Sequence, residues 1–170
     1  VVPLPDALSY EEAASLPTVF LPSWSILIRR AALKPWESAL ILSASSGVGT
    51  AAIQVAKNVV GARVIATTST DEKARRAREL GADEVINYST DDIAERVREA
   101  TGGRGVDVVL DHVGTEFWPA AMASLAQGGR YGICGVTTGY KAELQLGLLF
   151  LRLQTVFGVF MGRKEDLRQI

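Results

Sequence analysis

The chain has 170 residues, enough for one domain with a sizeable hydrophobic core. Its 18 Lys and Arg residues nearly balance 19 Asp and Glu residues, which excludes the basic surface typical of proteins that bind nucleic acids or anionic membranes. Its single cysteine, Cys134, excludes an intrachain disulfide and a cysteine-rich zinc site within this chain. Since no apolar run is long enough to span a bilayer, we expect a cytoplasmic protein.

Prolines divide the first 35 residues into short pieces. The sequence Ser9-Tyr10-Glu11-Glu12 is a capping-box pattern and predicts the start of a short helix. Pro22 suits the first position of a helix, so we predict a second helix from there toward Arg30. A turn around Pro35 then leads into the first strand.

Strand and helix patterns alternate through the rest of the chain. Short apolar runs predict strands at 39–42, 64–67, 84–87, 106–110 and 129–134, with a last strand from Thr155 to Phe160. Helices are predicted between them at 48–59, 71–80, 90–100, 117–125 and near 143–151, the second of them capped through Ser69-x-x-Glu72. This order predicts an α/β fold, with a doubly wound six-stranded parallel sheet and helices on both faces.

A turn of small residues joins the first strand to its helix. It contains Ser46, Gly47, Val48 and Gly49, and such a turn lets the backbone approach a pyrophosphate that the N–H groups at the helix start can bind. Two registers fit the glycine fingerprint, Gly47-x-Gly49-x-x-Ala52 and Ala44-x-Ser46-x-x-Gly49. We prefer the second because it begins directly after the strand. The alternative is a loop that only connects strand to helix.

The end of the second strand bears on the choice of cofactor. NAD-binding domains place an acidic residue there, which binds the ribose 2′-hydroxyl. Here the position is Thr68, followed by Ser69, and hydroxyl groups do not repel a 2′-phosphate as a carboxylate would. Lys73 lies one helical turn further on and could pair with the phosphate. We therefore predict NADP(H), the alternative being that Ser69 only caps the helix and Lys73 is solvated.

Several segments match one known family in order along the chain. They are Ala13-Ala14-Ser15-Leu16-Pro17-Thr18, the turn from Ser43 to Lys57, the run from Glu79 to Tyr88, the run from Thr101 to Asp111, and Gly128-Gly129-Arg130. With these segments the chain resembles the cofactor-binding domain of the medium-chain dehydrogenase/reductase superfamily. The likeness is strongest to the quinone oxidoreductase-like branch, through the Ala-Ser-Ser-Gly-Val-Gly turn and Ile86-Asn87-Tyr88.

The resemblance implies a domain organisation. Residues 1–35 would form a junction with leading helices, and residues 36–170 a Rossmann-type dinucleotide-binding domain. The GroES-like catalytic domain of the family would lie outside this chain, and a small-molecule substrate would bind in the cleft between the two domains. The strand from Thr155 to Phe160 would be the edge through which family homodimers join their sheets, and an apolar edge left unpaired would favour aggregation.

The resemblance also implies residue roles. Tyr88 would lie near the 2′-phosphate. Val113 and Gly114 would line the cofactor, and Gly135 and Val136 would approach the nicotinamide. The alternative for these loop residues is that they serve only as connecting loops.

Zinc and catalysis are weighed on few residues. Thr18 stands at or beside the position where zinc alcohol dehydrogenases carry a catalytic ligand, and threonine is a poor zinc ligand. We therefore expect no zinc in this chain and a zinc-independent hydride transfer to a quinone or an α,β-unsaturated carbonyl. His112, the one histidine, is interpreted as a packing or hydrogen-bonding residue rather than an acid–base catalyst. The alternatives are a zinc-type alcohol dehydrogenase domain, an enoyl reductase module of a synthase, and a non-catalytic nucleotide-binding protein.

Overall fold

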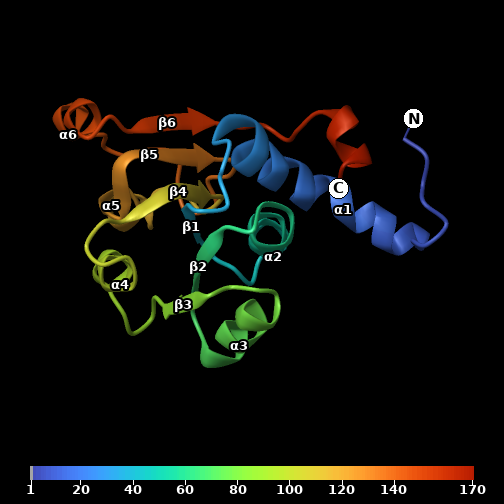
Figure 1. Cartoon of the computed structure of the whole chain (residues 1–170), viewed down its shortest axis with the longest axis horizontal. Helices are drawn as coiled ribbons and strands as arrows, with labels where there is room; N and C mark the ends of the chain where they lie inside the picture. Colours follow the sequence, from blue (N-terminus) through green and yellow to red (C-terminus); the bar gives the residue numbers. More distant parts are fainter. Residues whose placement is uncertain (1) are drawn as a thin grey trace.

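The computed structural model describes residues 2–170 (Figure 1). Its helices are α1 (Tyr10–Trp24), α2 (Gly47–Gln54), α3 (Asp71–Glu79), α4 (Ile93–Ala100), α5 (Trp118–Ala123) and α6 (Leu146–Leu151). Its strands are β1 (Ser38–Ile41), β2 (Arg63–Thr68), β3 (Glu84–Asn87), β4 (Val106–Asp111), β5 (Leu125–Ile133) and β6 (Thr155–Gly158). No helix in these residues is both long and apolar enough to cross a membrane.

Within residues 2–170, six strands form one sheet in the order β3-β2-β1-β4-β5-β6. Every neighbouring pair runs parallel. The chain therefore winds outward from β1 in one direction, then returns to β4 and winds outward in the other. This confirms the predicted doubly wound sheet and places its switch point between β1 and β4.

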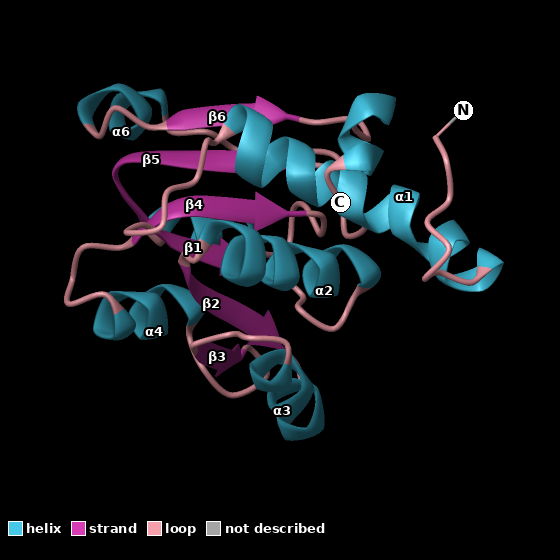
Figure 2. Cartoon of the chain, turned by 45° about the vertical axis from the view of Figure 1, so that its right-hand side comes forward, coloured by secondary structure: helices cyan, strands magenta, loops and turns pink. Residues whose placement is uncertain are grey.

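Helices cover both faces of the sheet, as the apolar strands require. On β1, Ala39 and Ile41 belong to a core shared with the first three helices, while Leu40 belongs to a core shared with α4 and α5. This alternation follows from the two-residue period of a strand. Figures 1 and 2 show α1 beside α2 on one face, and α6 near the edge strand β6.

The N-terminal helix differs from the prediction. The expected capping box is confirmed, because the Ser9 N–H donates to Glu12 at 2.8 Å and the Glu12 N–H donates to the Ser9 hydroxyl at 3.1 Å. The predicted break at Pro22 is wrong, since one helix passes through it and continues as a π-helical segment, Ser25–Arg30. Burial explains this, because residues 21–27 are all buried and their packing offsets the hydrogen bond that proline removes.

Two other local predictions also need correction. Helix α3 is capped by Thr70, whose hydroxyl accepts from the Lys73 N–H at 3.3 Å, so the capping box predicted at Ser69 is wrong. The Ser69 hydroxyl instead accepts a hydrogen bond from the Lys73 ammonium group at 3.2 Å. Strand β5 begins four residues earlier than predicted because Leu125 pairs with Val106 across a register shift in β4.

Helix α2 packs against the end of β1 at unusually close range. A Cβ atom on Gly49 would lie 2.4 Å from the carbonyl oxygen of Ser43 and 2.7 Å from Cα of Ala44. Both atoms belong to the backbone and have little room to move. This close approach is the role of the third glycine of a dinucleotide fingerprint and supports the register Ala44-x-Ser46-x-x-Gly49.

We predict that Gly49→Ala destabilises the domain by about 1–3 kcal/mol, because the added methyl group overpacks α2 against β1. The measurement is urea unfolding followed by circular dichroism. Gly147→Ala in α6 is the matched control, since its Cβ would meet nothing within 4 Å. An unchanged unfolding midpoint for Gly49→Ala would contradict the close packing.

Candidate cofactor site

The turn after β1 presents unpaired N–H groups at the carboxyl edge of the sheet. Ser46 caps α2, and its hydroxyl accepts from the Gly49 N–H at 2.9 Å. Within the described residues, the N–H groups of Gly47 and Val48 have no acceptor, as expected in the first turn of a helix. Gly47 is exposed, so an anion can approach closely. The geometry fits the pyrophosphate of a dinucleotide.

His112 ties the turn to the end of β4. Its Nε2 lies 2.8 Å from the Ser46 hydroxyl oxygen and 3.1 Å from the carbonyl oxygen of Leu42. Because a carbonyl can only accept, a proton on Nε2 satisfies the Leu42 contact. The imidazole thus holds the strand end and the turn together, which agrees with its interpretation as a hydrogen-bonding residue.

The residues predicted to meet a 2′-phosphate lie at the ends of β2 and α3. Thr68 is 1% exposed, and its hydroxyl donates to the Thr70 carbonyl at 3.4 Å, so its side chain faces inward. Ser69 is half-buried and Lys73 exposed, and their side chains meet as described above. The part of this group that solvent can reach is therefore the Ser69 hydroxyl and the Lys73 ammonium group.

Tyr88 lies beside the same strand end. Its N–H donates to the Thr68 carbonyl at 2.9 Å, which continues the pairing of β2 with β3. Its half-buried ring packs against Phe117, with 4.8 Å between ring centroids and 57° between planes. The backbone of Tyr88 thus lies near Thr68, while its ring extends toward the start of α5.

The loops after β4 and β5 contact each other closely. A Cβ atom on Gly114, which has φ +98°, would lie 2.8 Å from the Gly139 carbonyl and 3.0 Å from Cα of Val136. A Cβ atom on Gly135 would lie 2.6 Å from the His112 carbonyl. Both glycines therefore permit the two loops to meet beside the turn after β1. Val113 contributes its backbone to this edge, since its side chain is buried in the core.

Asp111 organises this edge, and the sequence pattern indicated no role for it. It is fully buried, and its Oδ1 accepts from the N–H groups of Val113 at 2.6 Å and Gly114 at 3.0 Å. Its Oδ2 accepts from the Tyr131 hydroxyl on β5 at 2.9 Å. Burial raises the pKa of Asp111 above its ordinary range, although these three donors act to lower it. A lone aspartate at the end of an apolar strand offered no signal of this network.

The residues of this chain do not fit a zinc ion. Within the described residues, no group of three or more His, Cys, Asp or Glu side chains could hold a metal. The His112 imidazole is engaged with Ser46 and Leu42, and burial raises the pKa of the Cys134 thiol to about 12, which disfavours the thiolate that zinc requires. Thr18, at the position compared with a zinc ligand, is exposed on α1.

A family comparison now identifies the chain's relatives. A family model described as zinc-binding dehydrogenase matches residues 47–170, nearly three-quarters of the chain. The chain belongs to the medium-chain dehydrogenase/reductase superfamily. It is 36% identical over 160 residues to quinone oxidoreductase-like protein 2 of Bos taurus, covering 94% of this chain and 46% of that protein. The chain thus spans about half the length of that relative.

Further matches broaden the range of relatives. The chain is 38% identical over 159 residues to a phenolphthiocerol/phthiocerol polyketide synthase of Mycobacterium tuberculosis, covering 94% of the chain and 7% of the synthase. The structure of an NAD-dependent alcohol dehydrogenase superposes with a TM-score of 0.92 at 41% identity, covering 99% of this chain and 49% of that one. The 2-octenoyl-CoA carboxylase reductase CinF, solved with NADP and 2-octenoyl-CoA, has a TM-score of 0.87 at 31% identity, covering 99% and 42%.

We predict that Asp111 makes the stability of the domain depend on pH. In the unfolded chain Asp111 ionises near its ordinary pKa of about 3.9, whereas in the folded state it retains its proton to higher pH. The wild type therefore loses stability relative to Asp111→Asn as pH rises above about 4. In the variant, an amide oxygen can still accept from Val113 and Gly114.

Urea unfolding of both proteins between pH 4.5 and 7.5 measures this difference. Tyr131→Phe serves as a control, since it removes one donor to Asp111 and retains the titrating carboxyl group. A difference between wild type and Asp111→Asn that is constant with pH, or that shifts in favour of the wild type at higher pH, would contradict the raised pKa.

Proposed function

We propose that the chain is the NADP(H)-binding domain of a zinc-independent oxidoreductase. Its reaction would transfer hydride to a quinone or an α,β-unsaturated carbonyl compound. The observation that carries the proposal is the Ser46–Gly49 turn, which presents free N–H groups where the order of strands reverses between β1 and β4. Dinucleotides bind at such switch points in doubly wound sheets. The family relationship supports an oxidoreductase.

The choice of NADP(H) rests on the end of β2. Ser69 and Lys73 form a hydroxyl–ammonium pair suited to a phosphate, and no carboxylate occupies the position that would bind a ribose 2′-hydroxyl. The nearest acid, Asp71, accepts from the Asn87 amide at 3.4 Å in the first turn of α3. Among the relatives, CinF was solved with NADP, whereas the alcohol dehydrogenase is described as NAD-dependent. The local chemistry of Ser69 and Lys73 therefore decides the proposal.

Each part of the carboxyl edge has a separate task in this proposal. The N–H groups of Gly47 and Val48 hold the pyrophosphate, and Ser69 and Lys73 hold the 2′-phosphate. The loops at Val113–Gly114 and Gly135–Val136 position the nicotinamide, with Asp111 and His112 fixing their backbone. The reduced nicotinamide supplies hydride when bound. Residues outside this chain would complete the substrate cleft.

The match to a polyketide synthase favours one narrower alternative. In that alternative the chain is an enoyl reductase module, whose substrate is an α,β-unsaturated thioester carried by a larger synthase. Sequence beyond both ends of the chain distinguishes the two, since a module would be flanked by other synthase domains. Both functions would use the same hydride donor and an electron-poor carbon as its acceptor.

We predict that Lys73→Gln weakens NADPH binding about tenfold, equivalent to about 1.4 kcal/mol, because it removes the charge that pairs with the 2′-phosphate. NADH binding should not change. Isothermal titration calorimetry of the chain with both cofactors measures this. Arg78→Gln on the same helix is the matched control, since it removes one exposed positive charge and should leave both affinities unaltered. Equal losses for NADPH and NADH, or no loss, would contradict the assignment.

We also propose that the chain forms a homodimer through the strand from Thr155 to Phe160. Strand β6 (Thr155–Gly158) lies at the edge of the sheet, so one side of its backbone is unpaired by the described residues. Apolar side chains beside it are exposed, including Leu153 at 70% and Phe160 at 98%. Such an edge is a surface for pairing with a second strand.

We predict that Leu153→Asp combined with Phe160→Asp converts a dimer into a monomer, because four aspartates would meet across the two copies. Light scattering coupled to size-exclusion chromatography measures the mass against 18.2 kDa for one chain. Tyr10→Asp, at another exposed apolar residue, is the control and should leave the dimer intact. A wild-type chain that is monomeric at 100 µM, or a dimer unaffected by the double substitution, would contradict the proposal.

A further inference from the structure

A groove between α5 and α6 lies apart from the turn after β1. It has a volume of about 550 Å³, within the range of small-molecule sites. Its apolar wall consists of Trp118, Pro119, Met122, Leu144 and Leu148. It begins near Thr115 and Lys141, on the loops that follow β4 and β5. Its other end lies at Arg98, Arg152 and Gln154, near the amino ends of the strands.

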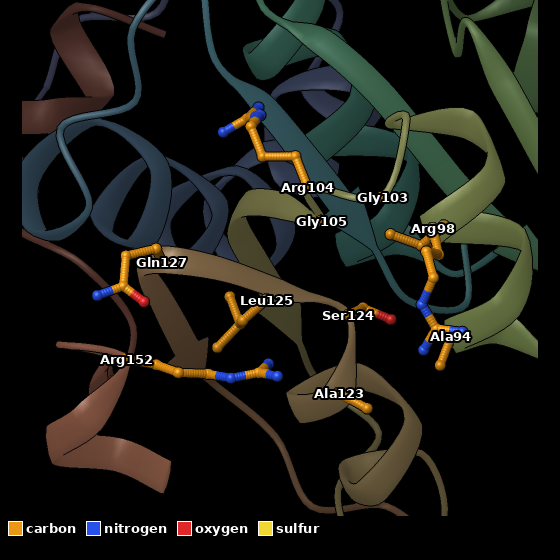
Figure 3. A pocket seen from close by; sticks show the side chains of 11 residues that line it. Ala94, Arg98, Gly103, Arg104, Gly105, Ala123, Ser124, Leu125, Gln127 and Arg152 are labelled. Carbon is orange, nitrogen blue, oxygen red and sulfur yellow. The ribbon is translucent and has the colours of Figure 1, made fainter.

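Two arginines mark that far end. Arg98 and Arg152 line the groove and also a neighbouring polar cavity of about 260 Å³. Figure 3 shows their guanidinium groups approaching the space beside Ala123 and Ser124 from opposite sides. Within residues 2–170, neither guanidinium forms a hydrogen bond or ion pair with another side chain. Arg104 in the same cavity differs, because it pairs with Asp107 at 2.6 Å.

Gln154 supplies an independent sign that the groove holds a ligand. The residue is 9% exposed and lines the groove, and its Nε2 has no hydrogen-bond partner in the described part of the chain. An unsatisfied buried donor costs about 1–3 kcal/mol. A ligand that accepts from this amide would remove that cost.

The charges along the groove indicate which ligand would bind. Arg98, Lys141 and Arg152 are cationic, whereas Glu143 is the one carboxylate in the lining. Guanidinium groups favour planar or tetrahedral oxyanions, which accept several N–H groups at once. The apolar wall between the two ends suits a hydrocarbon chain.

We propose that this groove binds an amphipathic anion. Its phosphate or carboxylate head would lie between Arg98 and Arg152 and accept from the Gln154 amide. Its alkyl or acyl chain would lie along α5 against Trp118 and Leu148. This site is separate from the proposed cofactor site, and its test does not depend on which cofactor the chain binds.

The indole N–H of Trp118 provides a local probe, since it donates to the Glu143 carbonyl at the groove wall at 2.8 Å. The experiment titrates the 15N-labelled chain with octyl phosphate and, in a second arm, with octanoate, in the presence of excess NADPH. We expect saturable shifts of the Trp118 indole and Gln154 amide signals, while those of Trp24 and Trp36 stay in place. The arm with the stronger binding identifies the preferred head group.

Matched ligands and variants complete the test. Octanol lacks the anion and inorganic phosphate lacks the chain, so each should bind at least tenfold more weakly than octyl phosphate. The double variant Arg98→Gln/Arg152→Gln should bind octyl phosphate at least tenfold more weakly. Arg75→Gln/Arg78→Gln on α3 removes the same charge elsewhere and should bind as the wild type does.

Three results would overturn the proposal. The first is the absence of saturable shifts at Trp118 with either amphipathic anion, as expected if a second copy of the chain covers the groove. The second is equal binding to the wild type and to Arg98→Gln/Arg152→Gln. The third is that excess NADPH abolishes the shifts, which would place the alkyl anion in the cofactor site instead.

Discussion

The close approach of α2 to the end of β1 at Gly49 is the constraint on which the rest of the structure depends. With a Cβ atom 2.4 Å from the Ser43 carbonyl, a larger residue at this point would push the helix away from the sheet. The helix could then neither bury Ala52 and Ile53 against the core nor begin directly at the strand end. Its free N–H groups lie at the carboxyl edge because of that short turn.

Hydrogen bonds hold this edge in place without a ligand. His112 connects β4 to the turn through Ser46 and Leu42, and Asp111 connects the following loop to β5 through Tyr131. Three neighbouring strand ends are thereby fixed relative to each other. A dinucleotide that binds here meets donors already in position, which reduces the entropy lost on binding. The burial of Asp111 is the cost of this arrangement.

The sheet was predictable from sequence because its strands are short apolar runs separated by helix caps and glycines. The dinucleotide turn was predictable for the same reason, as its signal lies in consecutive residues. Pro22 misled the prediction because tertiary burial outweighs the local preference of proline. Ser69 and Thr70 both suit a helix cap, and the Lys73 side chain engages Ser69. The roles of Asp111 and Gln154 were not predictable, since their partners come from distant segments.

The turn after β1 is proposed above all to bind the pyrophosphate of a dinucleotide through free N–H groups. The most direct measurement follows backbone amide signals of the 15N-labelled chain during titration with NADPH. We expect the largest saturable shifts at Gly47, Val48 and Gly49, with smaller shifts at Gly114 and Gly135. Saturable binding that leaves the Gly47 and Val48 amides unshifted, or no binding at millimolar NADPH, would contradict this role of the turn.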